Sequence, residues 1–274
     1  GFEEPRAAYR YDPKVYGNRV YSAAGKPDRE AELVYGPNIT DWPDMEALGE
    51  NLLLKVVSFI TDPVTTTDEL IPSGETSSFR SNPVGLAEFT LSRKDPGYVG
   101  RAKAVQEAAA ILREGGIIFA SGGDTGLPEL TRVLKSLNRI AGEERKFQFG
   151  SAIFARKPGD GSAREQAASC QRVLGGLANF ANEYATKRYR SNLINWGILP
   201  FNIEGEPPFK NGDYVFIRGI RKAVASAAPE TEAWIISARD GNAAAFSLKV
   251  PGLEDSEREI VLAGSLINYN RART

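Results

Sequence analysis

The stretch GDGSAREQAA, residues 159–168, places a serine and an arginine behind two glycines, at the start of an expected helix. Ser162 and Glu165 fit the S-x-x-E pattern of a capping box, in which the serine caps the helix and the glutamate reaches back. A helix N-terminus also presents free N–H groups and the positive end of a dipole, which favour a bound carboxylate. The stretch therefore supports two hypotheses: a plain helix cap, or a serine held at an anion site for acid–base chemistry.

Further candidates lie in and after the long polar loop at residues 61–85. Arg80, in SSFRSNP, is flanked by hydroxyl groups and suits bidentate recognition of a carboxylate, although loop arginines are usually solvated. Asp68 and Glu69 are paired acids before a turn, a pattern more typical of capping or solvated residues than of catalytic ones. Cys170 stands among alanines, which favours a core position over a nucleophile.

The composition excludes several classes of function. The 274 residues include no histidine and one cysteine, so this chain alone ligates no iron–sulfur cluster or cysteine-based zinc site. A formal net charge of −1 gives no basic field for nucleic acid or a membrane surface, and RKFQF and KRYRSN do not change this. Small anions can still be bound by local arginines. The low cysteine content fits a reducing compartment, and we expect the cytoplasm.

The elements expected to position these residues alternate between strands and helices. Residues 1–48 read as an extended interdomain linker, and residues 49–274 as one domain. The missing initiator methionine suggests part of a larger protein. We expect strands at 51–60, 117–121 and 147–155. We expect helices at 98–116, at 126–142 and from the serine motif to about residue 173. The last third should be mostly β, with strands in DYVFIRGI, EAWIISAR, AAFSLKV and REIVLAG.

Four segments, taken in order, resemble the C-terminal swivel domain of the aconitase family of iron–sulfur hydro-lyases. TTTDELIPSG resembles Thr-Asp-His-Ile-Ser-x-Ala-Gly, and Arg80 falls six residues after Gly74, at the spacing of a substrate-binding arginine of that family. GDGSAREQAA resembles Gly-Glu-Gly-Ser-Ser-Arg-Glu-His-Ala-Ala, the most specific of the matches. YRSNLINWGILPF resembles Asn-Leu-x-x-x-Gly-Leu-Leu-Pro-Leu, and AGSLINYNRA resembles the ending Ala-Gly-Ser-Ala-Leu-Asn-Arg.

The resemblance implies an α/β fold, namely an aconitase-type swivelling β/β/α domain with a β-rich barrel-like core, flanking helices and an extended N-terminal linker. It implies a hydro-lyase that reversibly dehydrates a hydroxy-polycarboxylate, with citrate and isocitrate as the default substrates. By this resemblance Ser162 is the general base and Asp68 an active-site acid. Arg80 and Arg164 bind substrate carboxylates, and Ala163 takes the substrate-facing position of the family's second serine.

The resemblance also implies that the catalytic site is incomplete in this chain. In the family a [4Fe-4S] cluster is held by three cysteines on preceding domains, and its iron acts as a Lewis acid on the departing hydroxyl. We therefore expect a cluster-bearing partner, on the same polypeptide or a separate chain, and an inactive isolated domain.

Departures from the family pattern keep a second hypothesis open. Ala163 lacks the hydroxyl of the family's second serine, Gln166 replaces a histidine, and Glu69 replaces another. The alternative is a non-catalytic relative that binds carboxylates or associates with RNA. DELIPS is also close to the Asp-x-Ile-Ile-Pro of the isopropylmalate isomerase small subunit, although this chain is longer than we expect for that subunit.

Overall fold

The computed structural model describes residues 10–17, 25–32, 34–115, 127–141 and 146–273. The chain divides into two units, residues Gly1–Gly36 and Pro37–Thr274. The first unit contains one short helix, α1 (Lys14–Gly17), in its described part. All other described elements belong to the second unit. The boundary of the linker at residue 48 stays a prediction.

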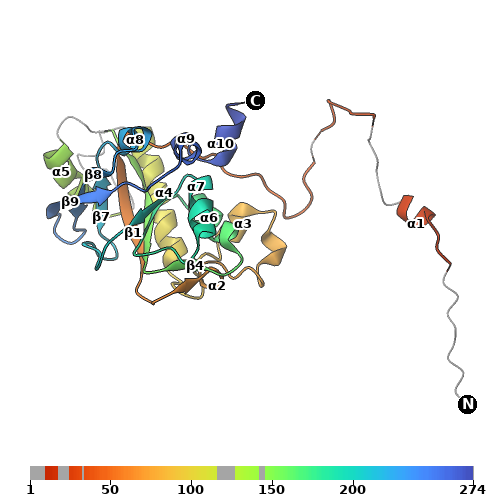
Figure 1. The fold of residues 1–274 in the computed structure, drawn as a ribbon, viewed down its shortest axis with the longest axis horizontal. Helices are drawn as coiled ribbons and strands as arrows, with labels where there is room; N and C mark the ends of the chain where they lie inside the picture. The colour runs from red at the N-terminus through yellow and green to blue at the C-terminus, as the bar shows by residue number, and fades with distance from the viewer. Residues whose placement is uncertain (1–9, 18–24, 33, 116–126, 142–145, 274) are drawn as a thin grey trace, which may run out of the picture. The chain divides into compact units, whose positions relative to one another are not determined.

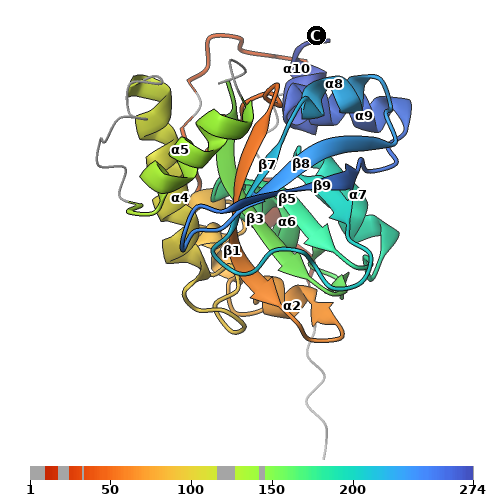
Figure 2. The same ribbon diagram turned by 90° about the vertical axis from the view of Figure 1, so that its left-hand side faces the viewer.

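The second unit is built on a seven-stranded mixed sheet with the order β6-β5-β3-β1-β7-β8-β9. Four neighbouring strands are parallel: β1 (Leu52–Ile60), β3 (Gln148–Ala155), β5 (Gly176–Ala181) and β6 (Leu199–Asn202). Three antiparallel strands continue the sheet from β1: β7 (Tyr214–Ile217), β8 (Glu230–Ile236) and β9 (Ala243–Lys249). The sheet twists and curls as a half-barrel with β6 and β9 at its edges, and helices lie on both of its faces (Figures 1 and 2).

The two faces of the sheet bury two separate sets of side chains. On β1, Leu53 and Val57 pack in one cluster, while Leu52 and Leu54 pack in the other, as the alternation of side chains along a strand requires. The first cluster includes residues of α4 (Tyr98–Gly115), α5 (Leu130–Ala141), α6 (Arg164–Val173) and α7 (Lys187–Asn195). The second includes residues of α8 (Ile220–Ala225) and α9 (Asp255–Ala263). Because parallel strands connect by right-handed crossovers, the helices between them gather on one face.

A smaller piece of structure lies beyond the carboxyl end of β1. A two-stranded parallel sheet joins β2 (Thr65–Thr66) to β4 (Pro158–Asp160). The helix α2 (Thr67–Leu70), the 3₁₀ turn η1 (Ser77–Phe79) and the helix α3 (Pro83–Ala87) follow β2 along the chain. The last helix is α10 (Leu266–Arg271).

The expected α/β fold with a β-rich core and flanking helices is confirmed. The predicted strands at 51–60 and 147–155 and the helices at 98–116 and 126–142 match β1, β3, α4 and α5 within a few residues. The loop at 61–85 is more ordered than expected, because it contains β2, α2, η1 and the start of α3. The predicted strand at 117–121 lies outside the described residues.

One prediction of the β-rich last third is wrong. REIVLAG forms the end of α9, not a strand. Glu254 and Glu257 form a capping box at the N-terminus of this helix, and Gly264 ends it in the left-handed conformation with φ of 89°. A four-residue apolar run cannot by itself distinguish a strand from one face of a buried helix.

None of the helices in the described part of the chain combines the length and apolar character that a bilayer-spanning segment needs.

Candidate functional site

The predicted site residues follow the carboxyl ends of neighbouring parallel strands. Asp68 follows β1, whereas Ser162 and Arg164 follow β3. The carboxyl ends of parallel strands meet at one edge of a sheet, which is where ligands bind in open α/β sheets. Pairing of Thr65 with Pro158 and of Thr66 with Asp160 joins the two loops directly.

Close packing at Gly161 joins the serine turn to the start of α2. Gly161 has φ of +136°, and a Cβ built on it would lie 2.1 Å from Oγ1 of Thr67. No side chain fits in this space, and L residues rarely adopt this backbone conformation. Glycine at this position therefore lets the turn before Ser162 lie against the loop that carries Asp68.

Ser162 does not cap the helix, so the predicted capping box is wrong. The helix α6 begins at Arg164, its N-cap residue is Ala163, and no side chain caps it. Glu165 accepts a hydrogen bond from Nε1 of Trp196 at 3.1 Å, which directs its carboxylate to α7 and away from the N-cap. Ser162 is exposed, and no hydrogen bond of its side chain occurs within the described residues. The serine hydroxyl is therefore available beside the N-terminus of a ten-residue helix.

Glu165 lies in the first turn of α6 and keeps part of its surface exposed. Burial raises the pKa of this carboxyl above its usual value, and the hydrogen bonds from Trp196 and Ser169 only partly oppose the shift. The protein environment therefore stabilises the charged form of Glu165 less than water does.

An open pocket of about 320 Å³ brings the serine motif together with the start of α7. Seven polar or charged residues line it: Ser162, Arg164, Glu165, Lys187, Arg188, Ser191 and Asn192. Ser162 and Arg164 thus share one pocket, as their spacing predicted. Lys187 and Arg188 were not among the predicted site residues, although KRYRSN marked this stretch as basic. Because α7 begins after β5, the parallel pairing of β5 with β3 brings these two cations to the serine.

Asp68 and Arg80 do not line this pocket. Asp68 is exposed and pairs with Arg93, which also pairs with Glu75. Arg80 is an exposed residue at the end of η1. Of the five predicted residues, the structure therefore brings Ser162 and Arg164 into one pocket, with Ala163 between them in the chain. It leaves the other two on surface loops outside the pocket.

The Arg80 loop is held by the segment that follows Gly36. The side-chain amide of Asn82 donates a hydrogen bond to Oδ1 of Asn38 at 2.9 Å, and Thr40 Oγ1 donates to Oδ1 of Asn82 at 3.1 Å. The backbone N–H of Thr40 also donates to the carbonyl of Ser81 at 3.0 Å. These bonds fix the loop directly after Arg80 and leave its side chain exposed.

Glu69 is a capping residue. Thr66 and Glu69 form the capping box at the N-terminus of α2, and Nζ of Lys94 lies 3.1 Å from Oε1 of Glu69. Partial burial alone would raise the pKa of the Glu69 carboxyl, but hydrogen bonds from Thr66 and Lys94 outweigh it and lower the pKa. This charge therefore stabilises the loop that carries Asp68.

Glu69→Gln should reduce stability at neutral pH and have no effect in acid. Because the folded pKa is lowered, the stabilisation by the ionised carboxylate is present above 4.5, the ordinary pKa of a glutamate carboxyl, and is lost as the pH falls through the folded pKa. Glutamine keeps a side-chain oxygen for the capping box, so we expect a loss of only about 0.5–1 kcal/mol at pH 7. Urea unfolding of both proteins between neutral and acidic pH measures this. A difference that does not change with pH would contradict the assignment.

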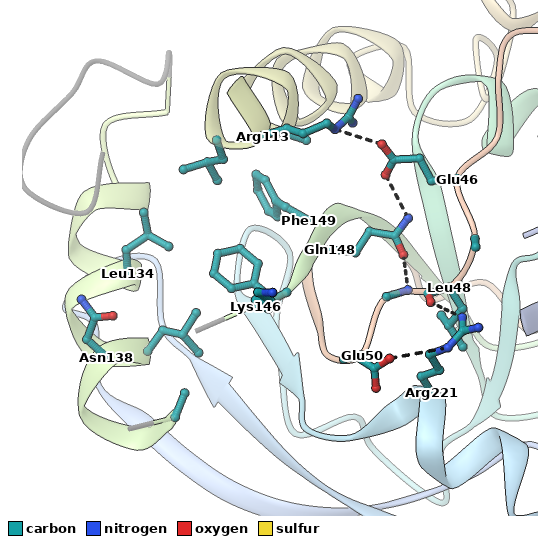
Figure 3. A pocket seen from close by; sticks show the side chains of 17 residues that line it. Glu46, Leu48, Glu50, Arg113, Leu134, Asn138, Lys146, Gln148, Phe149 and Arg221 are labelled. Carbon is teal, nitrogen blue, oxygen red and sulfur yellow. Dashed lines mark hydrogen bonds and ion pairs between the residues drawn. The ribbon is translucent and has the colours of Figure 1, made fainter. Parts of the chain in front are cut away.

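A larger cavity, of about 710 Å³, lies between α4, α5 and β3 (Figure 3). Apolar side chains line most of it, including Leu112, Leu134, Leu137, Phe147 and Phe149. Charged groups at its rim pair with each other: Nε of Arg113 lies 2.9 Å from Oε1 of Glu46, and Nε of Arg221 lies 3.6 Å from Oε1 of Glu50.

In the pocket beside Ser162, by contrast, no acidic side chain of the described chain lies within ion-pair distance of Arg164, Lys187 or Arg188. The smaller pocket is therefore the candidate site.

One protein-family model matches the part of the chain that forms this pocket. Residues 140–206 match the family model of the aconitase C-terminal domain. The predicted resemblance to this family is confirmed. The matching segment runs from the end of α5 to β6 and carries every residue that lines the pocket beside Ser162.

A solved structure is also similar to the chain. It is 3-isopropylmalate dehydratase from Methanocaldococcus jannaschii, with 22% sequence identity and a TM-score of 0.46 over 81% of this chain and 95% of that chain. No curated protein sequence matches the chain at a significant level.

Proposed function

We propose that this chain is the swivel-domain part of an aconitase-like hydro-lyase, which reversibly dehydrates a hydroxy-polycarboxylate of the citrate or isocitrate type. The observation that carries the proposal is the shared pocket of Ser162 and Arg164 at the start of α6, inside the segment that matches the aconitase C-terminal domain.

Ser162 is the proposed general base. As the alkoxide it accepts a proton from the carbon next to a substrate carboxylate and becomes the neutral hydroxyl. The negative charge that it carries before this transfer lies beside the free N–H groups of α6 and the guanidinium of Arg164. These groups favour the serine alkoxide, so that a chain without histidine can act as a base.

Arg164 is the proposed ligand of a substrate carboxylate. Its Nε is buried and has no hydrogen-bond partner within the described residues. A buried donor without a partner costs free energy, and a bound carboxylate would satisfy it. Ala163, as the N-cap residue between Ser162 and Arg164, contributes backbone rather than a hydroxyl.

Asp68 and Arg80 have proposed roles that depend on closure over a partner. Both are exposed on loops outside the pocket, where a facing domain can bring substrate against them. Asp68 would act as an acid after release from Arg93, and Arg80 would bind a second carboxylate.

The residues of this chain do not fit an iron–sulfur cluster of its own. Cys170 is buried in the core, and burial raises the pKa of its thiol to about 12. Across the ranges that the structure covers, no three His, Cys, Asp or Glu side chains gather as a metal site requires. A [4Fe-4S] cluster would therefore be held by the partner, where it would supply electrophilic assistance to the departing hydroxyl.

The test is hydratase activity of the full-length protein or complex that contains this chain. After reconstitution of the cluster, hydration of cis-aconitate, methylaconitate and homoaconitate should be measured by the loss of substrate absorbance. We expect turnover of at least one substrate by the complex and none by the isolated chain. Turnover by the isolated chain would contradict the shared site, and tight RNA binding without any hydratase activity would support the non-catalytic alternative.

A further inference from the structure

The start of α7 carries two cations where a helix normally disfavours them. Thr186 caps the helix by accepting a hydrogen bond from the N–H of Tyr189 at 3.2 Å, so Lys187 and Arg188 are its first two residues. The first turn contains no acidic residue. Because the N-terminus of a helix is the positive end of its dipole, these charges destabilise the free helix by a few tenths to about 1 kcal/mol each.

No group of the described chain compensates these charges. Lys187 and Arg188 are exposed, and neither forms an ion pair or side-chain hydrogen bond within the described residues. Arg164, the first residue of α6, lines the same pocket and leaves its buried Nε without a partner there. The N-termini of α6 and α7, with the cations Arg164, Lys187 and Arg188, thus line one pocket. Its single carboxylate, Glu165, accepts a hydrogen bond from Trp196.

The lining of the pocket also limits the chemistry of its ligand. Apart from the charged residues, Ser162, Ser191 and Asn192 complete it, and no apolar side chain is present. A ligand branch that ends in a carboxylate gains charge-assisted hydrogen bonds here, whereas an alkyl branch meets no apolar side chain to pack against.

We propose that Lys187 and Arg188 form a second carboxylate subsite beside Ser162 and Arg164, which selects a tricarboxylate over a dicarboxylate with an alkyl branch. This inference rests on the proposed function for the identity of the substrate. The two residues determine specificity: Arg164 binds the carboxylate next to the reacting carbon, and the start of α7 binds a further one.

The test compares Lys187→Gln/Arg188→Gln with the control Lys210→Gln/Lys222→Gln, which removes two exposed positive charges that do not line the pocket. Calorimetric titration of the full chain with tricarballylate and with isopropylsuccinate gives the affinities. We expect the pocket variant to weaken tricarballylate binding about tenfold or more, and the control to change it less than about twofold. Isopropylsuccinate should bind the wild-type chain more weakly than tricarballylate does.

Thermal unfolding without ligand gives a second readout that a merely structural role would not produce. The pocket variant should have a higher Tm than the wild-type chain, because two charges are removed from the positive end of α7. A lower Tm, an unchanged affinity for tricarballylate, no binding of it by the wild-type chain, or equal binding of isopropylsuccinate would each overturn the subsite.

Steady-state kinetics of the reconstituted complex separate this inference from the proposed function. The pocket variant should raise KM for the tricarboxylate more than it lowers kcat. If the complex is an active hydratase and KM does not change, the subsite is wrong and the proposed function stands. If the complex has no hydratase activity but tricarballylate binding depends on Lys187 and Arg188, the proposed function fails and the subsite stands.

Discussion

Ser162→Ala should lower the hydratase turnover of the reconstituted complex by between about 100-fold and 10,000-fold, the range typical of losing a general base. The folded state should hardly change. Ser162 is exposed, it does not cap α6, and it makes no side-chain hydrogen bond within the described residues. We therefore expect the free energy of unfolding to stay within about 0.5 kcal/mol of the wild-type value.

Kinetics and urea unfolding of the same preparation check both halves of this expectation. Ser226→Ala is a matched control, because Ser226 is another exposed serine and lies outside the pocket, at the end of α8. If Ser162→Ala lost activity only in proportion to a loss of stability, the serine would be a structural residue. If activity were unchanged, another group would be the base.

Gly159→Ala should strongly destabilise the folded chain, by about 2–5 kcal/mol. Gly159 has φ of +96°, and a Cβ built on it would lie 2.3 Å from the ring of Tyr189. The ring cannot move aside easily, because Tyr189 is fully buried and its hydroxyl accepts hydrogen bonds from Gln171 at 2.9 Å and Asn179 at 3.0 Å.

The same substitution should also reduce activity, because Gly159 connects the serine turn to α7. Its carbonyl accepts a hydrogen bond from Oγ1 of Thr186, the N-cap residue of α7, at 3.2 Å. A shift at Gly159 therefore moves the first residues of α7 relative to Ser162, which lies three residues further along the chain.

Gly212→Ala separates strain of the backbone from the clash with Tyr189. Gly212 has φ of +90°, but a Cβ built on it meets nothing within 4 Å. We expect a loss of only about 1–2 kcal/mol at this position, from the backbone conformation alone. Equal losses in the two variants, measured by urea unfolding, would show that Tyr189 moves aside and that packing at Gly159 is not decisive.

The core elements of the fold were predictable from local patterns. The apolar runs of β1 and β3 are buried on both faces, and such runs identify central strands of a parallel sheet. The helix α4 ends at Gly115, one residue before its predicted end at 116. REIVLAG was misread because its apolar run is short, and the capping box that starts α9 lies before it, at Glu254 and Glu257.

The candidate site was predictable only where its residues are neighbours in sequence. Ser162 and Arg164 share a pocket because they lie two residues apart at the start of one helix. The capping box failed because the partner of Glu165 is Trp196, 31 residues away. No local rule identifies such a partner.

The sequence by itself determined the types of group available: a serine and an arginine at a helix start, no histidine, and a single cysteine that packs in the core. It also determined where strands β1 and β3, which precede these groups, lie in the chain. Only the tertiary structure decided which charges meet there. The pairing of β3 with β5 brings Lys187 and Arg188 to Ser162, while Asp68 pairs with Arg93 and lies outside the pocket. Helix and strand propensities act over a few residues, whereas these contacts arise from the register of strands far apart in the chain.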